Sequence, residues 1–359
     1  MSVVSLFCGI GGLDLGFRQE GFNIIWANDN CPSIWSTYQH NHPNTYLDKR
    51  SLVSINSTEI PDCDLIIGGP PCQSWSVAGS NKGANDPRGK LFYEYQRVIA
   101  DKKPRVFVAE NVEGILSKKH QAEFQRIIAG FENIGYQVHC QLLNASDYMV
   151  PQDRMRVIIV GIRRDIKRNF EFPAKSRTKV TLGQAIGDLA NLPIKAYKRS
   201  DRMVSDVDSY LDDSYSPQYM SRNRVRSFDE LSYTIPATGR QVPIHPQAPK
   251  MIKVNTDLYR FCDDKGPEVY PRNGDTLYRR FTIHECARIQ TFPDSFTLLF
   301  NNIDDGYKML GNAVPVELAR RIAECIHPLI AAPTAPVPVS VPVPVPVPVP
   351  IKITLKKKI

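Results

Sequence analysis

Residues 5–17 read SLFCGIGGLDLGF, and this stretch decides the fold. The apolar run VVSLF is typical of a β-strand, and that strand ends in a turn at Gly9, Gly11 and Gly12. Because these glycines lack a Cβ, the backbone can approach a ligand closely there. The dinucleotide fingerprint GxGxxG needs a third glycine at the position where this chain has Asp14, so a pyrophosphate cradle is not favoured. The turn predicts a site for a nucleoside without a pyrophosphate.

The first 165 residues continue this alternation of strand and helix. The strand-like runs are VVSLF, NIIWAN, DLIIGG, RVFVAEN and RVIIVGI. Helix-like segments such as LFYEYQRVIADK and HQAEFQRIIAGFENIGY lie between them. Apolar strands separated by helices predict an α/β, doubly wound sheet of the parallel kind, buried on both faces.

Composition narrows the class of protein. The eight cysteines form no CxxC pair, which argues against a zinc site, and no apolar run reaches the roughly 20 residues of a membrane span. The N-terminus lacks a basic region before an apolar one, so we expect a cytoplasmic protein with reduced thiols. Residues 333–350 alternate proline with valine and predict an extended, disordered arm, so that the globular body ends near residue 330.

Polar side chains follow several of the predicted strands, and ligands of open α/β sheets gather at the carboxyl ends of strands. Asp29 follows NIIWAN, where such folds place an acidic residue on ribose hydroxyls; a helix cap is the alternative. Cys72 follows two prolines in GGPPCQSWS (68–76), a stiff turn that suits a nucleophile better than a packing residue. Glu110 follows RVFVA and is expected in the same crevice, unless it caps a helix.

The segment VPQDRMRVIIVGI places Gln152, Arg154 and Arg156 two residues apart. In a strand these three side chains share one face. Buried arginines without a ligand are costly, so this face is predicted to line a site, with solvated charge at the start of a strand as the alternative.

Five motifs in this order resemble the DNA (cytosine-5) methyltransferases. They are FxGxGG (7–12), PPCQ (70–73), ENV (110–112), QxRxR (152–156) and GNAVP (311–315), and the block at 279–296 is similar to a further family block. The resemblance covers the chain from about residue 3 to 326. It implies a Rossmann-like S-adenosylmethionine-dependent methyltransferase domain with a smaller, mostly β or irregular target-recognition domain.

The resemblance also implies a chemistry. Cys72 is the expected nucleophile on C6 of a cytosine flipped out of the duplex, and C5 then takes the methyl group of S-adenosylmethionine. Glu110 is expected to hydrogen-bond N3 and the amino group of the base, and Arg156 its O2, with Arg154 in support. S-adenosylhomocysteine is the product, and no metal is expected. The residues expected to bind the cofactor are Phe7, Gly9, Gly11, Gly12, Asp29, Ser51, Pro71, Leu91, Asn312 and Val314.

Four positions depart from the family pattern. Asp29 stands where glutamate is usual, and Ser51 where an aspartate usually meets the adenine amino group. Met149 and Thr291 replace usual glycines. The loss of the charge at Ser51 predicts weaker binding of the cofactor.

Between about 174 and 278 the strand–helix rhythm disappears, and arginines gather at 222, 224, 226 and 240. Arginine is the commonest reader of guanine edges, so a guanine-rich target is predicted; for Arg222 a phosphate contact is the rival. The segments MSRNRVR (220–226) and GRQ…HPQAP (239–249) are similar to the HaeIII-type enzymes, which modify the inner cytosine of GGCC. The expected DNA-binding residues are Ser76, Arg222, Arg224, Arg226 and Arg240.

We therefore expect three parts: a catalytic domain of residues 1–173 plus 305–330, a target-recognition domain of 174–304, and a tail of 331–359.

The expected partner is double-stranded DNA, with no membrane. The enzyme is expected to be a monomer that shares its recognition sequence with a restriction endonuclease without a stable complex. A transfer-RNA cytosine-5 methyltransferase and a catalytically silent DNA-binding scaffold are the rival interpretations. The missing third glycine argues against a nicotinamide dehydrogenase.

Overall fold

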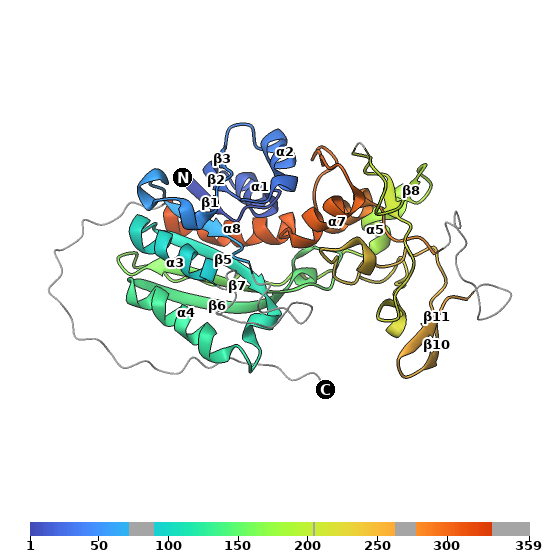
Figure 1. Cartoon of the computed structure of the whole chain (residues 1–359). Coiled ribbons are helices and arrows are strands. Elements are labelled where there is room, and N and C mark those ends of the chain that lie inside the picture. The colour runs from blue at the N-terminus through green and yellow to red at the C-terminus, as the bar shows by residue number, and fades with distance from the viewer. Residues whose placement is uncertain (72–89, 204, 263–277, 332–359) are drawn as a thin grey trace.

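The computed structural model describes residues 1–71, 90–203, 205–262 and 278–331 (Figure 1). Its centre is a seven-stranded sheet in the order β3-β2-β1-β4-β5-β7-β6. The strands are β1 (Ser2–Leu6), β2 (Asn23–Asn28), β3 (Tyr46–Asp48), β4 (Leu65–Gly68), β5 (Val106–Val112), β6 (Tyr136–Asn144) and β7 (Met155–Arg163). The five strands from β3 to β5 in this order are parallel.

Helices cover both faces of the sheet, as the sequence predicts. Helices α1 (Gly12–Gln19) and α8 (Val316–Ile330) lie on one face, and α3 (Lys90–Lys102) and α4 (Gln121–Asn133) on the other (Figure 1). Successive strand residues serve the two layers in turn: Leu65 and Ile67 pack with α1 and α8, whereas Ile66 packs with α3 and α4. This alternation explains why the strands are apolar without a break.

The sheet differs from the expected parallel one at one edge. Strand β7 is antiparallel to both β5 and β6, because only a short connection with one 3-10 turn (Ala145–Tyr148) separates β6 from β7, and so short a return must reverse the chain. Strand β6 was not predicted. Most of its side chains are half-buried or exposed, so it carries no continuous apolar run.

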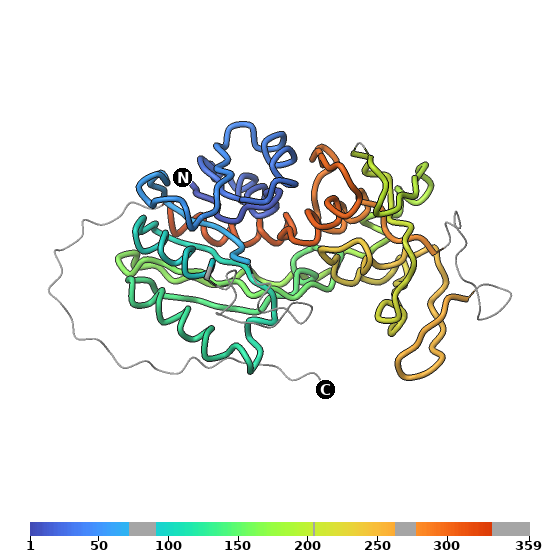
Figure 2. Tube along the Cα trace, viewed as in Figure 1, coloured from blue at the N-terminus to red at the C-terminus, as the bar shows by residue number. Residues whose placement is uncertain are grey.

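Helix α8, near the C-terminus, packs against the N-terminal part of the chain. Helix α8 runs back beside the first residues of the chain (Figure 2). A Cβ on Gly16 of α1 would lie 2.5 Å from the Cβ of Ala319, so the two helices touch backbone to backbone there. Helices α1 and α8 thus form one packed layer on this face of the sheet.

The rest of the chain extends the molecule to one side of the sheet (Figure 1). Its elements are α5 (Leu182–Ile186), α6 (Ile283–Ile289), α7 (Ile303–Asn312), β8 (Lys195–Tyr197), β9 (Ser209–Leu211), β10 (Ile252–Asn255) and β11 (Leu258–Arg260). Helix α2 (Pro32–Asn41) instead connects β2 to β3 beside the sheet (Figure 1). One apolar core joins Ile10 and Tyr38 to Leu182, Phe281 and Leu310. A smaller core contains Tyr219, Val225, Ile244, Phe261 and Tyr278.

The first of these cores takes residues from both predicted domains, whereas the second lies wholly inside 174–304. The domain limits remain a prediction. No helix within the described ranges is long and apolar enough to cross a membrane.

The close contact of β5 and β7 leads to a test of packing. Gly161 lies opposite Phe107, and a Cβ on Gly161 would stand 1.9 Å from that ring. The ring is itself held by Phe131, with centroids 4.3 Å apart. We expect Gly161→Ala to lower the free energy of unfolding by about 1–3 kcal/mol in urea denaturation, because overpacking forces the ring to move.

Gly187→Ala is the matched control, since nothing lies within 4 Å of its added Cβ and its φ is −62°. That variant should change stability by no more than about 1 kcal/mol. Equal stability of the two variants would mean that Phe107 yields without cost.

Candidate active site

Several of the predicted site residues meet at one edge of the sheet. The carboxyl ends of β1, β4 and β5 share this edge because these strands are parallel. Strand β7 begins there because it is antiparallel, and Arg156 stands opposite Val112 in the register. The reversed strand thus delivers the QxRxR motif to the edge where the other motifs end.

Glu110 and Arg156 form an ion pair at this edge. The Nε of Arg156 lies 2.7 Å from Oε1 of Glu110, and each side chain is 11% exposed. Arg156 also donates to the carbonyl of Met155 at 2.6 Å. Both groups are mostly buried but still reach solvent, so the carboxylate and the guanidinium can each hydrogen-bond a planar polar ligand.

The GGPP turn lies beside the same carboxylate. A Cβ on Gly69 would lie 3.3 Å from Oε2 of Glu110, and Nδ2 of Asn111 donates to the carbonyl of Pro70 at 3.2 Å. The half-buried Pro71 follows. Cys72 and Ser76 lie outside the described residues, so their positions stay predictions.

The glycine turn after β1 has a left-handed backbone. Phe7, Gly9 and Gly11 have φ values of 55°, 55° and 85°. A Cβ on Gly9 would meet nothing within 4 Å, whereas one on Gly12 would lie 2.4 Å from the carbonyl of Val314. One side of the turn is open to a ligand and the other is packed on the GNAVP segment, which fits a bound nucleoside.

Asp29 supports this turn from β2. Its two carboxylate oxygens accept from the backbone N–H of Gly9 and of Cys31, each at 2.9 Å. Burial raises the pKa of Asp29 above its usual value, against these hydrogen bonds. Each oxygen keeps a lone pair for a ribose hydroxyl, so the geometry is compatible with the predicted ribose contact. Asp29 also has a structural role, because it holds the backbone at Gly9.

The other predicted cofactor residues lie around this edge. Ser51 precedes a short 3-10 turn after β3 and is half-buried, and Leu91 is half-buried in the first turn of α3. Asn312 is exposed at the end of α7, and Val314 is buried against Gly12.

A buried polar cluster under the turn was missed by the sequence analysis. Asp14 accepts hydrogen bonds of 2.6 Å from the hydroxyls of both Ser5 and Tyr38. The ring of His42 stacks on Tyr38 with centroids 4.4 Å apart, and its Nε2 would lie 2.2 Å from a Cβ on Gly11. Burial lowers the pKa of His42 to about 4, aided by nearby Arg18, so the ring is neutral. The only sequence signal was an acidic residue in an otherwise apolar helix start.

Arg154 and Gln152 do not face the Glu110 pair. Arg154 is buried and donates to the carbonyls of Ile235, Gly311 and Ala313 at 3.1, 2.8 and 3.0 Å. Gln152 is buried between Gln290 and the N–H of Ile235. The burial of Arg154 is thus balanced by backbone carbonyls, and its position is that of a support.

The four arginines predicted to bind DNA fall into three environments. Arg224 is buried, stacks on Tyr219 and donates to the carbonyls of Tyr219 and Gln218. Burial lowers its pKa to about 10. Arg222 and Arg240 are exposed, and Arg226 is partly exposed.

Arg280, in the block 279–296, also turned out to be structural. It is buried, stacks on Tyr215 with 4.3 Å to the ring centroid, and donates to the carbonyls of Leu211 and Asp213. The neighbouring Arg279 pairs with Glu285 through two contacts of 2.7 Å. Arg279 thus contacts α6, and Arg280 contacts the segment at Leu211–Asp213.

Met149 and Thr291, which replace usual glycines, keep a glycine-like backbone. Their φ values are 65° and 60°. For a β-branched residue such as Thr291 this conformation is strained. Its hydroxyl accepts from the N–H of Glu317 and donates to the carbonyl of Gln290, which offsets part of that strain.

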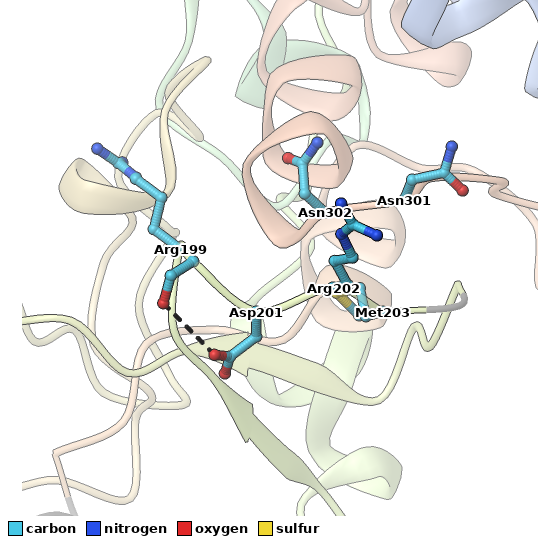
Figure 3. A pocket seen from close by; sticks show the side chains of 7 residues that line it. Arg199, Asp201, Arg202, Met203, Asn301 and Asn302 are labelled. Atoms are coloured by element: carbon cyan, nitrogen blue, oxygen red, sulfur yellow. Dashed lines mark hydrogen bonds between the residues drawn. The ribbon is translucent and has the colours of Figure 1, made fainter.

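A surface depression lies away from this edge (Figure 3). It is lined by Arg199 to Met203 and by Asn301 and Asn302. It contains neither Glu110 nor the glycine turn, and Arg199 is occupied by Asp304. We assign it no part in the site.

The chain belongs to the family of C-5 cytosine-specific DNA methylases, whose pattern matches residues 1–327. It is 50% identical over 329 residues to the Type II methyltransferase M.MthTI of Methanothermobacter thermautotrophicus, covering 91% of this chain and 97% of that protein. It is 49% identical over 333 residues to M.FnuDI of Fusobacterium nucleatum, covering 91% and 94%. The chain is therefore a DNA (cytosine-5-)-methyltransferase, and the predicted family is confirmed.

Solved structures agree on the fold. A structure described as a prophage-encoded DNA modification methyltransferase of E. coli has a TM-score of 0.71 at 22% identity, covering 92% of this chain and all 100% of that one. DNMT2 of Spodoptera frugiperda has a TM-score of 0.64 at 18% identity, covering 92% and 99%. The predicted α/β, Rossmann-like methyltransferase fold is confirmed.

The cluster under the glycine turn leads to a test that depends on pH. Burial raises the pKa of Asp14 from 3.8 to about 6, so the free energy of unfolding falls as pH rises from 3.8 to about 6 and stays lower above that range. Tyr38→Phe removes one of its two donors and enlarges the cost of the ionised form. We expect a loss of about 1–3 kcal/mol in the free energy of unfolding at about pH 7.5, and a smaller loss near pH 5, by urea titration.

Tyr95→Phe is the control, because the buried hydroxyl of Tyr95 donates at 2.9 Å to the carbonyl of Val108 rather than to an acid. The decrease in the free energy of unfolding caused by Tyr95→Phe should be the same at both pH values. A loss in Tyr38→Phe that is equally independent of pH would contradict the assignment of an ionisable Asp14.

Proposed function

We propose that this enzyme methylates C5 of the inner cytosine of GGCC in double-stranded DNA, with S-adenosylmethionine as methyl donor and S-adenosylhomocysteine as product. The observation that carries the proposal is the Glu110–Arg156 pair beside the GGPP turn that leads to Cys72. The open side of the glycine turn, near Gly9 and Asp29, supports a nucleoside cofactor at the same edge.

The proposed reaction assigns a step to each of these side chains. The Cys72 thiolate adds to C6 of a flipped-out cytosine, while Glu110 hydrogen-bonds N3 and the amino group and Arg156 holds O2. This addition makes C5 nucleophilic. When bound, S-adenosylmethionine would supply an electrophilic methyl group for C5 and leave as S-adenosylhomocysteine. Loss of the C5 proton to solvent then restores the 5,6 double bond of the base and releases the Cys72 thiolate.

The proposed target rests on the recognition segments. The relatives M.MthTI and M.FnuDI are Type II methyltransferases, and MSRNRVR and HPQAP in this chain are similar to HaeIII-type enzymes. A Type II setting supports a restriction–modification system. In it, a monomeric methyltransferase and a separate endonuclease share one recognition sequence without a stable complex.

The first test is transfer of label from S-adenosylmethionine to a duplex with one GGCC, beside a duplex with those bases shuffled. We expect label on the GGCC duplex alone and none with Cys72→Ala. Glu110→Gln should lower the rate on the order of 10²–10⁴-fold, because the base is no longer activated.

Each other outcome selects a rival. Label on both duplexes keeps the enzyme and removes the GGCC target. Label on transfer RNA alone favours the transfer-RNA enzyme, and no label on any substrate favours the silent scaffold.

Ser51 leads to a separate prediction on cofactor affinity. An aspartate there would offer the adenine amino group a charged acceptor, and hydrogen bonds to charged groups are stronger. We expect Ser51→Asp to tighten S-adenosylhomocysteine binding by about 1 kcal/mol, roughly fivefold, by calorimetry. Ser51→Ala is the control for the hydroxyl and should not tighten binding; an unchanged Kd in Ser51→Asp would remove Ser51 from the adenine site.

A further inference from the structure

Arg226 differs from the other three arginines of the recognition region because it is held and still reaches solvent. We infer that Glu230 and Tyr233 are positioning residues that orient Arg226 toward a base edge and thereby set the enzyme's discrimination between DNA sequences. The inference rests on the proposed function and deepens it.

Three groups surround the Arg226 guanidinium. Its Nη1 lies 3.2 Å from Oε1 of Glu230, and its plane stacks over Tyr233 at 4.2 Å from the ring centroid. Its Nη2 lies 3.9 Å from Oδ2 of Asp153. The Arg226 side chain is 29% exposed, so its restrained guanidinium can still contact DNA.

Glu230 is itself fixed. Its Oε2 accepts from the N–H of Ser227 at 2.8 Å and from the Ser227 hydroxyl at 3.0 Å, and it pairs with Lys250 at 3.2 Å. The N–H of Ser227 is the main cause that lowers the pKa of Glu230 to about 2. Glu230 is therefore ionised at every working pH and offers Arg226 a fixed anion.

Tyr233 belongs to a segment that is docked on the catalytic edge. The N–H of Ser232 donates to Pro151, and the N–H of Asp153 donates to Ser232, each at 2.9 Å. Arg154 donates to Ile235 two residues beyond the tyrosine. Tyr233 thus has a defined place relative to Arg156, and so has the guanidinium stacked on it.

The other arginines lack this combination. Arg224 spends its donors inside the protein, and Arg222 and Arg240 are exposed. A guanidinium that is already oriented loses less conformational freedom when it binds a base. It is also less able to rotate toward a non-cognate base. Glu230 and Tyr233 should therefore act on discrimination more than on general affinity for DNA.

The experiment measures kcat/KM for methyl transfer to a GGCC duplex and to duplexes with one base pair changed. We expect Arg226→Ala to reduce the cognate preference, and Glu230→Gln and Tyr233→Leu to reduce it on the order of tenfold, a share of what one good bidentate contact supplies. Tyr233→Phe should retain the preference, since the ring remains. Asp229→Asn is the matched control: it makes the same charge change one residue away, at an exposed position, and should leave the preference within about twofold.

A double-mutant cycle separates positioning from folding. In an Arg226→Ala background, Glu230→Gln should cause no further loss of preference, because the group that it orients is gone. Independent losses in the cycle would overturn the inference. So would an equal rise in activity on all duplexes in Glu230→Gln and Asp229→Asn, which would mean that Glu230 acts through net charge alone.

The wild-type enzyme distinguishes this inference from the proposed function. Selective wild-type methylation that Glu230→Gln retains overturns only the inference. Absence of wild-type methylation on every duplex overturns the inference together with the proposed function.

Discussion

The structure depends on one buried guanidinium, that of Arg154, at the start of β7. It binds carbonyls of Ile235 in the recognition region and of Gly311 and Ala313 in the GNAVP segment. These segments are far apart in the chain, and each hydrogen bond from a charged group such as this guanidinium contributes about 1.5–3 kcal/mol. The three segments must therefore come together around Arg154, or the cation would be buried without compensation.

This constraint links chemistry to recognition. Arg156 lies two residues beyond Arg154 and pairs with Glu110, while the segment around Ile235 runs back to Tyr233 and Arg226. The Gly311–Ala313 side leads to Val314, whose carbonyl packs on Gly12 of the cofactor turn. The residues proposed for target reading, base activation and cofactor binding are thereby all linked to the start of β7.

Much of the fold followed from pattern alone, and the misses have physical causes. The continuous apolar runs located β1, β2, β4, β5 and β7, because strands buried on both faces have no polar alternation. Strand β6 was missed because it lies at the sheet edge, where water satisfies its polar side chains. For the site, residue type and strand position pointed to Glu110 and Arg156. Residue type and position could not predict which arginines are buried. Arg154 and Arg224 are buried, whereas Arg222 and Arg240 are exposed, and nothing in the residue type distinguishes these two cases.

The amino-acid sequence by itself determined the layered α/β architecture, the glycine turn and the family, because these depend on local periodicity, backbone freedom and motif order. Only the tertiary structure decided what each polar side chain does. Asp14 is a buried anchor under the turn, Asp29 holds that turn through the backbone N–H of Gly9, and Glu230 restrains Arg226. The physical reason is that a polar side chain has many potential partners in sequence, and burial and packing select among them.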